Sequence, residues 1–226
     1  MLRERTALPL SEFLQYLASH EQIEQTLPAL ASLSRELGIS VGSLREQLEV
    51  ARALGFVEVR PRLGIRRQPY TFLPAVRQSL AYALIRDKEN FIRFADLRRH
   101  IESAYWHEAV ALLTPEDHAA LKSLAARAWE KLRGSPIEIP HPEHRQLHLT
   151  IFGRLQNTFV EGILQTYWDA YEAVGLNVFT DYAYLTGVWT YHQKMVDSIC
   201  NGDFEAGYLA LTEHSDLINQ LISSSK

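Results

Sequence analysis

Two glycines, Gly38 and Gly55, most strongly constrain how the N-terminal third of this chain can fold. Each follows a stretch in which apolar residues recur at three- and four-residue steps, as on one face of an α-helix. Because glycine readily adopts the left-handed backbone that closes a helix, the pattern predicts two short helices joined by a tight turn after Gly38. Ser40 supplies a side-chain oxygen suited to begin the second helix. The spacing therefore predicts a helix-turn-helix.

An arginine-rich segment follows this helix pair. The alternating sequence FVEVR predicts a strand, and the basic loop at residues 59–67 contains four arginines and no acidic residue. Two helices across a tight turn, then a strand and a basic loop, predict a winged helix-turn-helix domain over residues 1–68. The predicted helices of this domain are residues 10–19, 29–37 and 40–54.

A winged helix-turn-helix places its second helix in the DNA major groove, so the start of that helix and the basic loop are candidate DNA contacts. Arg45 is the strongest single candidate. Two alternatives remain open: Arg45 can pair with Glu49 one helical turn away, and the loop arginines can be a solvated surface. The candidate DNA-binding residues are Ser40, Gly42, Ser43, Arg45, Arg60, Arg62, Arg66 and Arg67.

The composition is that of a globular protein, and the charge is unevenly placed along the chain. The 226 residues are 46% hydrophobic and 22% charged, with a formal net charge of -4. Residues 1–70 hold nine Arg, no Lys and eight Glu, or +1, which leaves 14 basic and 19 acidic residues, or -5, in the rest. We see no apolar run long enough to cross a bilayer and no signal peptide, so we expect a cytoplasmic protein with no membrane partner. The single cysteine, Cys200, predicts no disulfide.

Helical spacing dominates the remainder of the chain. Residues 69–75, with prolines at two positions in QPYTFLP, predict a linker. Beyond it, residues 76–226 predict an antiparallel bundle of six or seven helices, so the fold class is mainly α. The expected helices are residues 76–85, 91–113, 115–132, 144–155, 159–174, 180–199 and 203–222.

Four histidines in this helical region have spacings that suit a metal ion. His144 and His148 are four residues apart, so their imidazoles point the same way from one helix. His192 and His214 belong to two later helices, and all four can face the axis of the bundle. Imidazole nitrogens suit zinc, nickel, cobalt, copper or iron. The alternative is that a chain with nine histidines places some at helical spacing by chance, as a polar helix edge.

The motifs in order resemble a known family. SLSRELGISVGSLREQLEVARALGFVEVRPRLG is similar to the winged-helix head of GntR-type bacterial transcription regulators. The helical region resembles the FCD ligand-binding domain of the FadR subfamily. The segments that carry this second resemblance are Asp96 to Glu102, His148 to Ile151 with Asn157, Tyr191 to Gln193, and Glu213 with His214.

The resemblance implies specific roles for residues. His144, His148, His192 and His214 would be the metal ligands, and Arg98 would face the carboxylate of a small effector. This chain has His144 where the family has an aspartate, which removes a negative charge from the site. Ala31 and Val41 stand where many relatives have DNA-contacting arginines, which leaves more of the contact to Arg45 and the basic loop. For Arg98, pairing with Glu102 at the i,i+4 spacing is the alternative.

These inferences predict a non-enzymatic, ligand-responsive transcription regulator. We expect it to bind a double-stranded DNA operator as a homodimer, a divalent transition metal such as zinc or nickel, and a small carboxylate effector. A metalloenzyme that uses the histidines to activate water is an alternative, although no HExxH motif accompanies them. A helical interaction protein without a sensing role is another.

Overall fold

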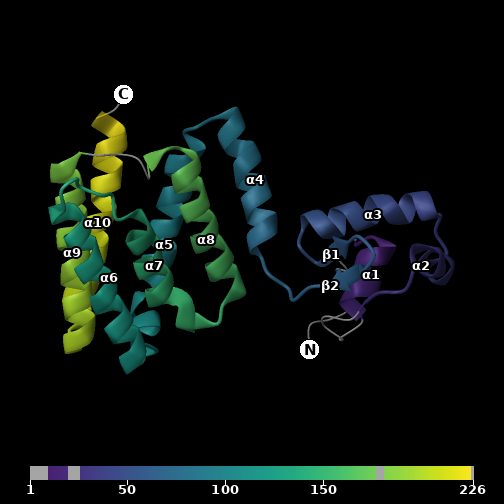
Figure 1. The fold of residues 1–226 in the computed structure, drawn as a ribbon, viewed down its shortest axis with the longest axis horizontal. Helices are drawn as coiled ribbons and strands as arrows, with labels where there is room; N and C mark the ends of the chain where they lie inside the picture. Colours follow the sequence, from purple (N-terminus) through teal and green to yellow (C-terminus); the bar gives the residue numbers. More distant parts are fainter. Residues whose placement is uncertain (1–9, 20–25, 177–180, 225–226) are drawn as a thin grey trace. The chain divides into compact units, whose positions relative to one another are not determined.

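The computed structural model describes residues 10–19, 26–176 and 181–224, which form two compact units divided after Ala75 (Figure 1). Ten α-helices and one two-stranded antiparallel sheet make up these described residues, which confirms the mainly α prediction. Within them, no helix combines the length and apolar character needed to cross a membrane.

The N-terminal unit contains the predicted helix-turn-helix. Its elements are α1 (Glu12–Ser19), α2 (Leu30–Leu37), α3 (Val41–Ala53), β1 (Val57–Arg60) and β2 (Gly64–Arg67). Gly38 has the left-handed φ of 68° that the turn requires, and its N–H donates to the carbonyl oxygen of Ser34. The Ser40 hydroxyl oxygen accepts a hydrogen bond from the backbone N–H of Ser43, so Ser40 is the N-cap of α3 as expected.

One apolar core holds these short helices together. Because a helix of eight residues is marginal in isolation, α1 and α2 depend on burying their apolar faces against α3. The sheet contributes one inward side chain from each strand. The buried members are Phe13, Leu17, Leu33, Leu44, Leu48, Ala51, Val57 and Ile65.

The basic segment differs from the prediction because it contains a second strand. β2 pairs with β1 in antiparallel register, with Val59 opposite Ile65. Residues 64–67 are therefore strand, and only residues 61–63 connect the two strands. Arg62 in this connection has a positive φ of 65°, which is uncommon for a residue with a side chain. The wing is thus a β-hairpin with Arg62 at its tip.

The C-terminal unit is a bundle of seven described α-helices, within the predicted six or seven. Their bounds are α4 (Leu73–Arg86), α5 (Asn90–Ala111), α6 (Pro115–Arg133), α7 (His141–Phe152), α8 (Thr158–Ala173), α9 (Tyr182–Asn201) and α10 (Phe204–Ser224), with a 3-10 turn, η1 (Gly153–Leu155).

The largest departures of the helix boundaries from the prediction are about three residues, at the start of α4 and at both ends of α7. α4 begins at Leu73, so the last three residues of the predicted linker at 69–75 are helical; its Pro74 stands in the first turn, where the missing N–H has no cost. α7 begins at His141, three residues earlier than expected, and Pro142 again stands in the first turn. The predicted start of a helix at Thr180 lies outside the described residues.

Packing within the bundle brings three helices, α5, α6 and α8, against α7. α5 lies against α7, α8 and α10, while α6 packs on α7 and α9 (Figure 1). α9 and α10 run side by side, because Gly202 ends α9 with a left-handed φ of 75° and reverses the chain. α7 therefore lies between the long helices, so polar side chains on its inward face are enclosed.

Candidate metal centre and nucleic-acid interface

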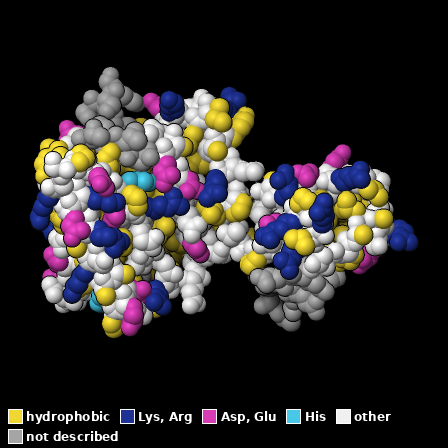
Figure 2. Space-filling model, viewed as in Figure 1, with side chains coloured by type: hydrophobic (Ala, Val, Ile, Leu, Met, Phe, Trp, Pro, Cys, Tyr) yellow, Lys and Arg dark blue, Asp and Glu magenta, His cyan; other side chains and the backbone are white. Residues whose placement is uncertain are grey.

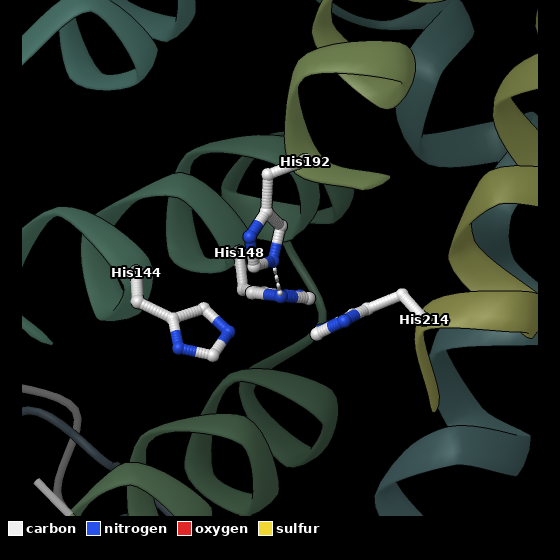
Figure 3. Close-up of side chains that lie close together, drawn as sticks. All are labelled: His144, His148, His192 and His214. Atoms are coloured by element: carbon white, nitrogen blue, oxygen red, sulfur yellow. Dashed lines mark hydrogen bonds between the residues drawn. The ribbon is translucent and has the colours of Figure 1, made fainter. Parts of the chain in front are cut away.

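The four predicted histidines lie together inside the bundle. His144 and His148 project from α7, His192 from α9 and His214 from α10, and their rings converge on one point (Figure 3). One nitrogen from each ring lies within 4.8 Å of one nitrogen from every other ring. All four side chains are buried. The structure thus assembles the set that the sequence could only suggest.

Local structure explains the convergence. One helical turn separates His144 from His148, so both rings extend from the same face of α7, with centroids 5.3 Å apart. The reversal at Gly202 places His192 and His214 on facing sides of the α9–α10 pair, with ring centroids 4.3 Å apart. The cluster therefore combines two histidines that lie one turn apart on α7 with two that the chain reversal between α9 and α10 brings together.

Burial makes these imidazoles suited to bind a metal. Desolvation lowers the pKa of His144, His192 and His214 well below the ordinary histidine value, and neighbouring imidazoles lower it further. Burial also lowers the pKa of His148, although the nearby Glu102 carboxylate opposes the effect. A metal binds the neutral form of histidine, so the folded protein holds the ligands in their binding state at neutral pH.

The hydrogen-bonding pattern also fits a metal. His144 Nε2, His192 Nδ1 and both ring nitrogens of His214 have no hydrogen-bond partner among the described residues. A buried polar atom without a partner is costly, and a metal ion would satisfy several of these atoms at once. The donor set of four nitrogens is one that zinc and nickel accept.

Glu102 is a member of this centre that sequence reasoning treated only as a partner of Arg98. Its Oε1 lies 3.1 Å from Nδ1 of His148, and His148 Nε2 lies 3.1 Å from His192 Nε2. A proton on Nδ1 would be donated to the carboxylate and would leave the lone pair of Nε2 for a metal. Carboxylates commonly orient metal-binding histidines in this way. The Glu at the end of the segment Asp96 to Glu102 was the available signal.

Arg98 lies beside the histidines, as its predicted effector role requires, and also makes the pair that was its alternative. Its Nη2 is 2.9 Å from Glu102 Oε2 and 2.8 Å from His148 Nδ1. The guanidinium also lies over the Tyr167 ring, 4.4 Å from its centroid. Arg98 is only 3% exposed, so its charge is buried at the centre.

Aromatic side chains enclose the cluster. The Trp168 ring centroid lies 4.6 Å from that of His144, and the Trp189 centroid lies 4.8 Å from that of His192. Rings at these distances exclude water and hold the imidazoles in place.

A narrow cleft leads from the surface to His144. Its volume is about 10 Å³, close to the space that one water molecule needs. The start of α7, the end of α8 and the first turns of α9 form its walls. The lining residues are Ile139, Pro140, His141, His144, Tyr171, Leu176, Tyr184, Leu185, Val188 and Trp189.

The predicted DNA-contacting residues of α3 lie at its exposed N-terminal end. Gly42 and Arg45 are exposed, and Ser43 is half-buried with its hydroxyl 3.4 Å from Gln47 Nε2. Glu49 forms an ion pair of 2.7 Å with Arg52, so the alternative pairing of Arg45 with Glu49 is absent. The Arg45 guanidinium has no ion pair among the described residues.

The four arginines of the wing have different surroundings. Arg62 and Arg66 are exposed, and Arg60 pairs with Glu58 at 2.7 Å. Arg67 instead is half-buried and lines a 450 Å³ cleft that α1 and Tyr70 also line. Figure 2 shows basic side chains spread over the visible face of this unit.

A winged helix-turn-helix unit followed by an all-helical unit with buried histidines defines a class of two-unit proteins. Residues 94–217 match the model of the FCD domain family, and the chain belongs to that family. This match confirms the resemblance that the sequence motifs indicated.

Solved structures share the fold over nearly the whole chain. The structure of "Streptococcus agalactiae GntR" is similar with a TM-score of 0.66 and 16% identity, covering 92% of this chain and 95% of that one. That of "E. coli McbR/YncC" gives a TM-score of 0.50 and 18% identity, covering 96% and 99%. No curated protein sequence matches the chain significantly. The fold of this chain is thus similar to that of both proteins over nearly their whole length.

Proposed function

We propose that this protein is a transcription regulator whose affinity for a DNA operator responds to a small carboxylate bound at a metal in its FCD domain. The convergence of four buried, neutral histidines in a chain that also has a winged helix-turn-helix carries this proposal. The first feature supplies a binding site for a small molecule, and the second a surface for DNA.

His144, His148, His192 and His214 would hold a divalent transition metal, with zinc or nickel as the best candidates. When bound, the metal supplies a Lewis-acidic position at which a carboxylate oxygen can bind. Glu102 orients His148 through Nδ1, and the Arg98 guanidinium supplies N–H donors to which an anion can bind. The aromatic walls keep water from competing.

The DNA surface in this proposal is the start of α3 with the exposed part of the wing. Arg45 is free to reach a base edge, and Arg62 and Arg66 can contact phosphates. Ser40, Gly42, Ser43 and Arg60 complete the set, whereas the half-buried Arg67 is better placed to support α1. A homodimer would present two such surfaces to a palindromic operator in the cytoplasm.

Regulation requires that the effector bind two states of the protein with different affinity. The cleft beside His144 has room for about one water molecule, so even a small carboxylate must move its walls apart. We propose that this movement of α7, α8 and α9 alters the placement of the two DNA-binding heads and thereby the operator affinity.

A sensing role also agrees with the chemistry of Glu102. It is the carboxylate nearest the histidines among the described residues, and both of its oxygens face partners: His148 at 3.1 Å and Arg98 at 2.9 Å. A carboxylate held in this way is a poor general base, because its charge is stabilised by the arginine. We therefore favour a regulator over a metalloenzyme.

Selection of duplexes from a random DNA library by the zinc-loaded protein tests the proposal. We expect recovery of a palindromic sequence whose half-sites lie about one helical turn apart. Folded, metal-loaded protein that enriches no sequence would refute DNA recognition. Light scattering that finds only monomer, with and without the selected duplex, would refute the dimer.

A further inference from the structure

The side chains inside the metal centre carry no net negative charge. Arg98 is 3% exposed and Glu102 is fully buried, and their ion pair of 2.9 Å contributes no net charge. A histidine binds a metal through a neutral ring nitrogen, so the four imidazoles add no charge of their own. The negative charge of Glu102 is already balanced by Arg98. The protein therefore provides no further negative charge at the centre to balance a metal cation.

Neither Glu143 nor the buried tyrosines beside the cluster correct this balance. Glu143 is buried next to His144 in sequence, but its carboxylate forms an ion pair with Lys131 at 2.9 Å. Burial raises the pKa of Tyr167 to about 12 and that of Tyr171 higher still, so both phenols are neutral. A divalent metal held by the histidines would thus leave two positive charges inside the protein without a counter-charge.

Near the histidines there are also buried hydrogen-bond donors that lack acceptors. Arg98 Nε, Tyr167 Oη and Trp168 Nε1 are buried and lack an acceptor among the described residues. The three side chains adjoin one another, since the Arg98 guanidinium lies 4.4 Å from the Tyr167 ring centroid and 5.5 Å from that of Trp168. Two of these donors are neutral and one is cationic, so this side of the cluster has more hydrogen-bond donors than acceptors.

We propose that the effector is a small dianion, specifically a short dicarboxylate, and that monocarboxylates of the same size bind more weakly. This inference rests on the proposed metal site and specifies its ligand. A dianion reduces the buried charge from +2 to zero, whereas a monoanion leaves one unbalanced charge in a low-dielectric interior, which is costly. The narrowness of the cleft beside His144 favours a ligand of few carbon atoms.

The test compares two ligands that differ in one charge. Succinate is a dianion at neutral pH, and succinamate, its half-amide, has nearly the same shape and one negative charge. Isothermal titration of each into protein loaded with one equivalent of zinc should give a dissociation constant about tenfold or more lower for succinate. Equal or tighter binding of succinamate, or failure of both to bind, would overturn the inference.

Two variants change the buried charge in opposite directions. His144→Asp adds one negative charge while keeping a zinc ligand, so the preference for succinate should fall toward equality. Glu102→Gln removes one negative charge, so the preference should rise, with zinc added to saturation. A succinate-to-succinamate ratio that is the same in wild type and in both variants would refute the charge argument even if one variant is too unstable to measure.

Zinc stoichiometry separates this inference from the proposed function. Wild-type protein that binds no stoichiometric zinc would refute both. Protein that binds one zinc per chain but prefers succinamate would refute only the dianion, and the metal-dependent regulator would stand.

Discussion

The carboxylate of Glu102 on α5 lies 3.1 Å from Nδ1 of His148 on α7, although 46 residues separate them in sequence. Both side chains have no exposed surface. The contact orients the His148 ring, and its Nε2 lies 3.1 Å from Nε2 of His192. A residue that never touches the metal can thus determine how well one ligand binds it.

Glu102→Gln should weaken zinc binding by about 10- to 100-fold, because the amide is a weaker acceptor and no longer fixes the His148 ring. Competition with a chromogenic chelator measures the affinity. Glu205→Gln is a matched control, since Glu205 also pairs with a histidine, His107 at 2.9 Å, but on the surface. Equal zinc affinity in the two variants would show that Glu102 does not position the ligand.

Replacing one ligand tests the metal centre directly. His192→Ala removes one of the four converging nitrogens, and we expect the zinc content to fall and the zinc-induced rise in melting temperature to shrink. His148→Ala should act similarly. The exposed His100 provides the control, because His100→Ala should retain wild-type zinc content. Full zinc content in both ligand variants would refute the site.

Arg45 and Arg52 offer a matched comparison on one helix. Arg45 is exposed near the start of α3 without an ion pair, whereas Arg52, near its end, pairs with Glu49. Arg45→Ala should weaken binding to the selected duplex by about 1–3 kcal/mol, and Arg52→Ala should have little effect. Fluorescence anisotropy at fixed salt measures both. Similar losses in the two variants would indicate only a general charge effect.

Two helical glycines should respond to alanine with opposite signs. A Cβ added at Gly207 would lie 2.6 Å from Cζ2 of the fully buried Trp106, whereas a Cβ at Gly187 meets nothing within 4 Å. Gly207→Ala should lower the free energy of unfolding by about 1–3 kcal/mol through overpacking. Gly187→Ala should raise it by about 0.5–1 kcal/mol, since alanine favours the helix. Urea denaturation measures both, and a shared sign would contradict the packing.

The sequence predicted best what local spacing determines. The i,i+4 relation put His144 and His148 on one face of a helix, and helical geometry alone brings their rings together. The turn at Gly38 and the cap at Ser40 were similarly predictable, because a left-handed glycine and an N-terminal serine act on adjacent backbone atoms. These features needed no knowledge of the tertiary fold.

Other features depend on contacts between distant segments. Trp168 and Tyr167 reach the centre only because α8 packs on α5 and α7, which no spacing within α8 reveals. β2 was missed because Ile65 is its one buried residue, and the pairing with β1 defines the strand more than its own sequence does. Successive strand residues point to opposite faces, so Arg67 points to the same face of β2 as Ile65, two residues earlier. The position of Arg67 in a cleft follows from that strand.

The capping box that begins α6 should make stability depend on pH in acid. The Arg154 guanidinium, 2.8 Å from Asp117 Oδ2, and the backbone N–H of Thr114 together lower the pKa of Asp117 to about 2. A depressed pKa in the folded state means that the contribution of Asp117 is fully present above the unfolded value near 4 and is lost as the pH falls through about 2. Asp117→Asn should therefore reduce stability by about 1–2 kcal/mol at pH 7, a range kept modest because Arg154 is half exposed.

Urea denaturation from pH 7 to pH 2 should show the difference from wild type shrinking only below pH 4. In an Arg154→Gln background the Asp117 pKa should return toward its ordinary value, so the same difference should disappear at higher pH. A difference that stays constant down to pH 2 would show that the charge of Asp117 does not stabilise α6.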